Sequence, residues 1–171
     1  MEITVHPIHV PANLTIRERV KLLDEKIEVN YRHFDHFSCE VELAYDIEVL
    51  LIWGDAVELT TDKNILDFMA ENNLRPVTPA EYLAFLVEFP GYVEEVDLII
   101  CLGAHFDEPK SSDEDGEGDD SMENFTWDWR HYLCHEVEDD QKLLGTDFVD
   151  DGIDDGDYWS KKCLFPAVRV K

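Results

Sequence analysis

The chain has 171 residues, of which 40 are acidic and 14 are basic, so its formal net charge is −26. A small domain needs a net charge of only roughly 2 to 8 to stay soluble, and so large an excess is informative about partners rather than about fold. It argues against direct binding to nucleic acid or to an anionic membrane, because both bind proteins through Lys and Arg. Hydrophobic residues make up 44% and aromatic residues 11%, which is enough for a packed core, so we expect one folded domain over 1–171.

The N-terminal residues 1–5 lack the basic and apolar stretches of a signal peptide, and no stretch reaches the roughly 18 apolar residues that cross a membrane. We therefore expect a cytoplasmic protein. In a reducing compartment, widely spaced cysteines outside any C-x-x-C pair act as small buried hydrophobic residues. Two disulfides in an oxidising compartment are the alternative. The four cysteines are Cys39, Cys101, Cys134 and Cys163.

A helix over about 15–27 is the first element expected. Thr15 and Glu18 have the spacing of a capping box. Apolar residues then recur at helical intervals, namely Ile16, Val20, Leu23 and Ile27.

In residues 40–49 large apolar side chains alternate with acidic ones, with Ala44 at one acidic position, which predicts a strand with one buried face. Residues 50–53 continue this strand to a turn signal at Gly54-Asp55. The buried face would carry Val41, Leu43, Tyr45, Ile47 and Val49. The other face would be strongly acidic, because it carries Glu40, Glu42, Asp46 and Glu48.

Two helices and a strand are expected next. The first helix is capped by Thr61 or Asp62, and the second begins at a capping box formed by Thr78 and Glu81. The short apolar run 98–102 is typical of a buried strand.

The C-terminal half is expected to be rich in strands and loops. Residues 107–124 are a run of Ser, Asp, Glu and Gly that cannot offset its ordering entropy by burial, so they predict a mobile acidic loop. Residues 132–134 are typical of a strand, and aromatic residues then alternate with turn signals. The complete pattern predicts an α+β fold with an N-terminal helix, an antiparallel sheet, two central helices and a β- and loop-rich C-terminal half.

The negative charge is concentrated in the second half. Residues 107–157 hold 20 acidic and 3 basic residues, whereas residues 1–106 hold 20 and 7. Carboxylates on one face of a strand recur at about 6.7 Å, close to the roughly 7 Å between successive phosphates of one nucleic-acid strand. The sequence therefore predicts an acidic surface that fits a channel built for phosphates. Its members are Glu40, Glu42, Asp46, Glu48, Asp113, Glu114, Asp115, Glu117, Asp119, Asp120, Glu138, Asp139, Asp140, Asp150, Asp151, Asp154, Asp155 and Asp157.

Other polar clusters give weaker signals. The Asp-rich segment 147–157 has oxygen ligands and glycines suited to a cation, but it lacks the EF-hand register. Histidines occur in three doublets, His6/His9, His33/His36 and His131/His135. In a strand the last pair would share a face and Cys134 would point away, which disfavours a shared zinc site. With no nucleophile elbow, activated cysteine or phosphate-binding loop, we expect no enzymatic activity, no resident metal and no cofactor.

Four stretches carry a resemblance: 74–83 (LRPVTPAEYL), 99–103 (IICLG), 154–159 (DDGDYW) and 163–169 (CLFPAVR). They resemble motifs of a group of small uncharacterised proteins from phage, plasmid and uncultivated-bacterial genomes, which implies no known activity. The acidic insert 107–124 is not part of that pattern. The Gly-, Asp- and Trp-rich ending also resembles C-type-lectin-like domains. In charge and size, though not in sequence, the chain is similar to the DNA-mimic proteins that phages and mobile elements use against restriction or CRISPR nucleases.

These features predict an acidic inhibitor from a phage or mobile element, located in the cytoplasm of the host bacterial cell. It would bind a basic, nucleic-acid-binding defence protein, such as a CRISPR or restriction nuclease complex, by nucleic-acid mimicry. The alternative is a lectin-like or other ligand-binding module with a cation in the loop 147–157. An acidic chaperone and a plainly solvated acidic surface stay open as well. The concentration of charge and the basic tail after residue 158 favour the inhibitor over a uniformly halophilic surface.

Overall fold

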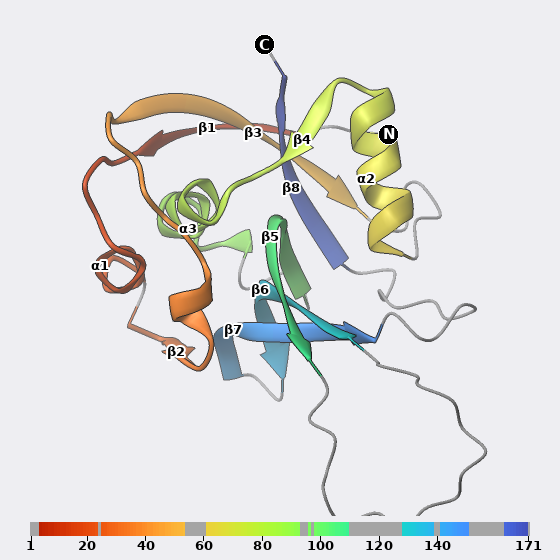
Figure 1. Cartoon of the computed structure of the whole chain (residues 1–171). Helices are drawn as coiled ribbons and strands as arrows, with labels where there is room; N and C mark the ends of the chain where they lie inside the picture. The colour runs from red at the N-terminus through yellow and green to blue at the C-terminus, as the bar shows by residue number, and fades with distance from the viewer. Residues whose placement is uncertain are drawn as a thin grey trace, which may run out of the picture.

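The computed structural model describes residues 4–23, 25–53, 61–92, 96, 98–109, 128–138, 141–150 and 163–170. This part of the chain forms three α-helices, a short 3-10 helix and one mixed sheet of eight strands (Figure 1). That composition is compatible with the expected α+β class. None of the described helices is long and apolar enough to span a membrane.

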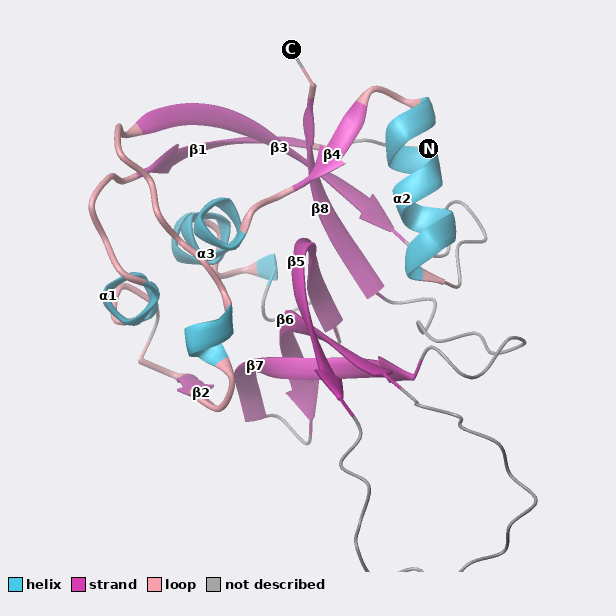
Figure 2. Cartoon of the chain, in the orientation of Figure 1, coloured by secondary structure: helices cyan, strands magenta, loops and turns pink. Residues whose placement is uncertain are grey.

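The sheet has the strand order β1-β3-β8-β5-β6-β7-β2, and β4 is a further neighbour of β8 (Figure 2). Strand β8 therefore lies inside the sheet, between β3 and β5, although it comes last in the chain. The strands are β1 (Val5–Val10), β2 (Ile27–Val29), β3 (Tyr45–Trp53), β4 (Leu74–Pro76), β5 (Leu98–Pro109), β6 (Asp128–Glu138), β7 (Gln141–Asp150) and β8 (Cys163–Arg169).

The sheet is mixed, whereas the sequence predicted an antiparallel one. Strand β8 is antiparallel to β3, where Val49 pairs with Val168, and parallel to β5, where Leu98 pairs with Cys163. Strand β2 is likewise parallel to β7. Because β3 and β5 run in opposite directions, a strand between them must be parallel to one of the two. The alternation pattern of a strand reports its faces and not its neighbours, so the sequence could not show this.

The helices begin where their caps predict. Thr15 and Thr78 form capping boxes with Glu18 and Glu81, and Thr61 caps the helix between them. The helices are α1 (Ile16–Val20), α2 (Asp62–Glu71) and α3 (Pro79–Glu88), and the 3-10 helix η1 covers Phe34–His36.

Helix α1 ends at Val20, so the prediction of a helix up to residue 27 is wrong at its C-terminal end. Ile27 begins β2 instead and pairs with Lys142 of β7. Ile27 is buried, as is Ile16, but it is buried as part of a strand. A single apolar residue at the end of a periodic pattern does not distinguish the two structures.

Strand β3 begins at Tyr45, so the prediction of a strand from residue 40 is wrong for residues 40–44. Leu43, expected in the core, is 81% exposed. The alternation holds from Tyr45 to Val49. The neighbouring strand β1 reaches only Val10, which pairs with Tyr45, and Asn13 then turns with a positive φ of 54°. Among the described strands, none pairs with residues 40–44.

Two hydrophobic clusters cover the two faces of the sheet. Val49 and Leu51 of β3 pack in a cluster with α1 and α3. Leu50 and Ile52, which point the other way, pack in a second cluster with α2. Figure 1 accordingly has α2 and α3 on opposite sides of β8.

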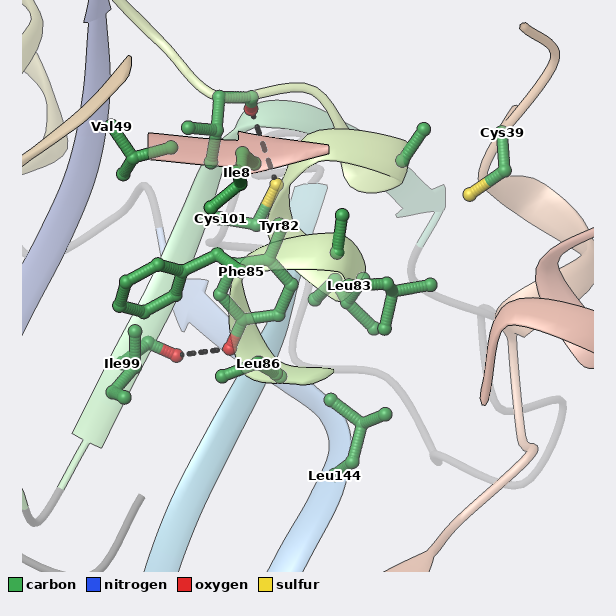
Figure 3. Packing of buried hydrophobic residues seen from close by; sticks show 14 of the residues in the cluster. Ile8, Cys39, Val49, Tyr82, Leu83, Phe85, Leu86, Ile99, Cys101 and Leu144 are labelled. Atoms are coloured by element: carbon green, nitrogen blue, oxygen red, sulfur yellow. Dashed lines mark hydrogen bonds between the residues drawn. The ribbon is translucent and has the colours of Figure 1, made fainter. Parts of the chain in front are cut away.

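Helix α3 is held tightly against β5 (Figure 3). The Tyr82 hydroxyl donates to the backbone oxygen of Ile99 at 2.7 Å, and Cys101 Sγ donates to the backbone oxygen of Val77 at 3.4 Å. A Cβ at position 103 would overlap that same Val77 oxygen, so only glycine fits there. Two of the four stretches that carry the resemblance, 74–83 and 99–103, therefore contact each other here and help to stabilise the fold.

All four cysteines are buried and none is joined in a disulfide, in agreement with the reduced state expected. Burial raises the pKa of the Cys39 thiol to about 11 and that of Cys101 to about 12. Neither residue therefore supplies a thiolate at neutral pH.

Candidate functional site

The structure places a minority of the eighteen acidic residues predicted from the sequence. Glu40, Glu42, Asp46 and Glu48 have described side chains, and all four are exposed. Glu138 and Asp150 are placed by their backbone, at the C-terminal ends of β6 and β7. The others lie outside the described residues, namely Asp113, Glu114, Asp115, Glu117, Asp119, Asp120, Asp139, Asp140, Asp151, Asp154, Asp155 and Asp157.

The segments predicted as loops are also placed in part. Residues 107–109, expected in the mobile acidic loop, extend β5 and pair with β6, so the loop prediction is wrong for those three. Residues 110–124 and the turn at 54–55 lie outside the described residues. Of the proposed cation loop, residues 147–150 belong to β7 and pair with β6, and residues 151–157 are likewise not described.

Strand β3 carries two exposed carboxylates on one face, Asp46 and Glu48. Same-face neighbours on a strand are about 6.7 Å apart. Asp46 Oδ1 lies 2.7 Å from Nδ1 of His9 on β1, and both side chains are largely exposed. Glu48 forms no ion pair with another described residue. We call Asp46 and Glu48 the β3 row.

A hollow of about 630 Å³ lies between residues 13–16 and 35–42. Three of its lining residues are exposed acids, Asp35, Glu40 and Glu42. The rest of the lining combines polar residues with the apolar Leu14, Ile16, Phe37 and Val41. We call this concavity the acidic hollow. It brings Glu40 and Glu42 together with Asp35, which was not singled out in the sequence because a lone Asp in a turn carries no pattern.

Local turns shape the acidic hollow. The backbone N–H of Asn13 donates to the Val41 oxygen at 2.9 Å, which ties the two lining segments together. His33 has a positive φ of 68° and starts η1, so the chain reverses before Asp35. Phe37 is buried and anchors the far side of η1.

The charge of the acidic hollow is only partly compensated. Arg17 Nη2 lies 3.2 Å from Asp35 Oδ2, but both side chains are more than half exposed, so this pair contributes little to stability. Arg17 also lies over the Tyr31 ring, 5.3 Å from its centroid. Glu40 and Glu42 have no ion-pair partner in the described part of the chain.

Exposed carboxylates also occur elsewhere, for example Glu28 on β2 and Asp67 and Glu71 on α2. Asp67 is neutralised by Lys63 at 2.6 Å. The acidic hollow differs from these positions by its concave shape and apolar walls, and not by being the sole place with negative charge.

Two ion pairs, each with a largely buried carboxylate and a partly exposed arginine, connect elements of the fold. Arg75 donates to both carboxylate oxygens of Glu81, and the Tyr45 hydroxyl donates to Glu81 Oε1. Burial by itself raises the pKa of Glu81, but the hydrogen bonds from Arg75 and the Thr78 amide outweigh it and hold the pKa below its usual value. The same carboxylate and burial raise the pKa of Tyr45 to about 12.

The second pair joins α2 to β6. Asp62 Oδ2 accepts from the Tyr132 hydroxyl at 2.6 Å and lies 3.1 Å from Arg130 Nη1. Burial and the Asp62 carboxylate raise the pKa of Tyr132 above its usual value. These side chains connect secondary-structure elements and offer no activated nucleophile.

Histidines gather around Phe106. Its ring stacks on His36 and His131 with centroid distances of 4.4 and 4.6 Å, and His33 lies 5.2 Å from His131. Cys134 packs in the cluster on the far face of β6 from His131, as the strand alternation predicted. Within the described ranges, no group of three His, Cys, Asp or Glu side chains is arranged to hold a metal ion.

Comparison with known proteins does not assign this chain to a family. No protein-family model, curated protein or solved structure matches this chain. The resemblance to small phage and plasmid proteins therefore stays a prediction.

Proposed function

We propose that this protein is a non-enzymatic, acidic inhibitor of phage or mobile-element origin that acts in the cytoplasm of the host cell. It binds a basic, nucleic-acid-binding protein, such as a nuclease complex of host defence, by standing in for nucleic acid. The acidic hollow and the β3 row belong to the binding face. The observation that carries the proposal is the acidic hollow, where Asp35, Glu40 and Glu42 surround apolar walls.

The acidic hollow suits an arginine or lysine of a partner. Such a side chain lays its apolar stem along apolar surface and keeps its charged head in a polar environment. Leu14 and Val41 offer the apolar surface, and Glu40 and Glu42 offer carboxylates that no described cation neutralises. A partner's arginine can also replace Arg17 on Asp35, because an exposed pair is easily exchanged.

The charge of the chain supports a partner that normally holds nucleic acid. With a net charge of −26, the protein creates a field that speeds the approach of a basic surface and repels a polyanion. When binding releases counterions, the logarithm of the affinity falls linearly with the logarithm of the salt concentration, as it does for proteins that bind nucleic acid. A protein evolved for phosphates is the kind of basic partner that such a field selects.

The proposal is tested by competition. A fluorescent duplex DNA is bound to a basic, sequence-nonspecific DNA-binding protein, and the chain is titrated in at several salt concentrations. We expect release of the DNA at low salt and a steep loss of that activity as salt rises. The double variant Glu40→Lys with Glu42→Lys should weaken the competition at least about tenfold, equivalent to ~1.4 kcal/mol.

The matched control is the double variant Glu25→Lys with Glu71→Lys, which makes the same change in net charge at exposed positions outside the acidic hollow. It should weaken competition by no more than about threefold, or ~0.7 kcal/mol. Equal loss in both variants would show that only total charge matters and would remove the acidic hollow from the proposal. A chain that never displaces DNA at any salt concentration would overturn the mimicry itself.

A further inference from the structure

Arg19 is a buried cation that pairs with no carboxylate among the residues that the structure describes. Only 2% of the surface of Arg19 is exposed. Its Nη2 donates to the backbone oxygen of Pro11 at 2.7 Å and more weakly to that of Cys39 at 3.4 Å. Its Nε and Nη1 are buried and have no hydrogen-bond partner in the described part of the molecule.

Three other arginines of this chain, Arg17, Arg75 and Arg130, are more exposed than Arg19 and are paired with carboxylates. The chain has 40 acidic residues, yet no described carboxylate pairs with the guanidinium that is most deeply buried. Burying an unpaired charge is costly, and buried N–H groups almost always have an acceptor.

Arg19 is one of the residues that line a small pocket with a volume of about 110 Å³. The other walls are mainly apolar side chains of α3 and of the segments before and after α1, namely Pro11, Leu22, Leu83, Ala84 and Val87, and His9 also lines the pocket. Glu88 also lines the pocket, but its Oε1 accepts the backbone N–H of His9 at 2.7 Å and makes no ion pair with Arg19.

We infer that this pocket binds a small monocarboxylate with a short, branched apolar chain. On binding, the Arg19 side chain shifts toward the pocket, so that its Nε–H and Nη1–H groups, which are buried in this structure, donate hydrogen bonds to the carboxylate. An apolar cavity of about 150 Å³ holds a benzene molecule, so the present volume suits an acyl chain of about four or five carbons. The apolar walls disfavour a bare inorganic anion, which would be stripped of water without compensation. A guanidinium is the side chain best suited to a carboxylate.

This inference is independent of the acidic hollow. The negative field of the protein repels a free carboxylate, so salt should not weaken this binding as it weakens binding of a basic partner. The two sites are therefore separable in one titration series.

The test follows the Arg19 Nε–H signal of the ¹⁵N-labelled protein by NMR during titration with isovalerate. The signal is assigned in the unmodified protein, so the result does not depend on a variant at Arg19. Isovaleramide, which has the same shape and no charge, and inorganic phosphate are the comparison probes. We expect a saturable shift with isovalerate, with a dissociation constant of about 1 mM or tighter, and no saturable shift with the other two.

A pocket-filling variant gives the second arm. Ala84→Leu places a larger side chain in the pocket and keeps Arg19, and Ala70→Leu makes the same change at an exposed position of α2. Isovalerate binding should weaken at least tenfold in the first variant and be unchanged in the second. No saturable shift with isovalerate in the unmodified protein, an equal shift with the amide or with phosphate, or full binding by Ala84→Leu would each overturn the inference.

Discussion

The acidic hollow and the Arg19 pocket both involve helix α1, and they handle charge in opposite ways. Ile16 lines the acidic hollow, and Arg19 lines the small pocket. In the hollow, the carboxylates of Glu40 and Glu42 pair with no described cation, but they are exposed. The guanidinium of Arg19 pairs with no described carboxylate, and it is buried.

The difference shows what decides the consequence of an unpaired charge. Exposed carboxylates are stabilised by water and salt ions, so they cost little and stay available for a partner. A buried guanidinium has neither, so it needs an acceptor that the protein or a ligand supplies. Burial, more than pairing, therefore separates the charges that matter for stability from those that matter for association.

Removing a buried partner should have the largest effect. Glu81 is fully buried and receives both Arg75 nitrogens, the Tyr45 hydroxyl and the Thr78 amide. Glu81→Ala should lower the free energy of unfolding by about 3 to 5 kcal/mol, because Arg75 loses its counter-ion and α3 loses its capping box. Urea denaturation measures this. A loss under about 1 kcal/mol would contradict the importance of burial.

A buried neutral histidine should make stability depend on pH. His135 is fully buried, and burial, helped by Lys142, lowers its pKa to about 4. As the pH falls from about 6.5 to 4, the unfolded chain takes up the proton first. The contribution of His135 to stability is thus complete above pH 6.5 and is lost toward pH 4, by about 3 kcal/mol in total.

The pH effect is measured by thermal or urea denaturation of the protein and of His135→Leu between pH 7 and pH 4. The carboxylates titrate in both proteins, so the difference between the two isolates His135. The variant should lose less stability over this range than the unmodified chain. Parallel pH profiles would show that position 135 takes no part in the acid response.

The smallest effect should come from an exposed pair. Asp35→Asn removes the charge that faces Arg17 at 3.2 Å, but both side chains are more than half exposed. The change in the free energy of unfolding should stay below about 1 kcal/mol. Asp67→Asn, which breaks the exposed pair with Lys63, is the matched comparison and should behave alike. A cost near that of Glu81→Ala would undo the contrast between buried and exposed charge.

Local chemistry made part of this structure predictable. The caps at Thr15, Thr61 and Thr78 are short-range signals, and all three begin a helix. The alternation predicted the faces of β3 from Tyr45 onward. It failed before Tyr45 because a strand also needs a neighbour, and β1 ends at Val10.

The candidate sites were harder to predict because they join distant segments. Glu40 and Glu42 were predicted as part of an acidic surface, but their meeting with Asp35 depends on the turn at His33. A signal for Arg19 was present in the sequence. It stands three residues after Ile16 and one before Val20, on the apolar side of the predicted helix, where a cation is out of place.

The position of β8 has a consequence for how this molecule is made. Val49 and Val168 pair although 119 positions separate them in the sequence, and β5 also depends on β8 for its link to β3. A polypeptide that emerges from the ribosome in order can form α3, which contacts β1 and β3 directly, and the β5–β6–β7 meander early. The meander, however, cannot join β3 in one sheet until residues 163–169 have been synthesised. Such long-range pairing is slow compared with helix formation. The nascent chain therefore passes through a stage in which the edges of β3 and β5 that β8 later covers are unpaired.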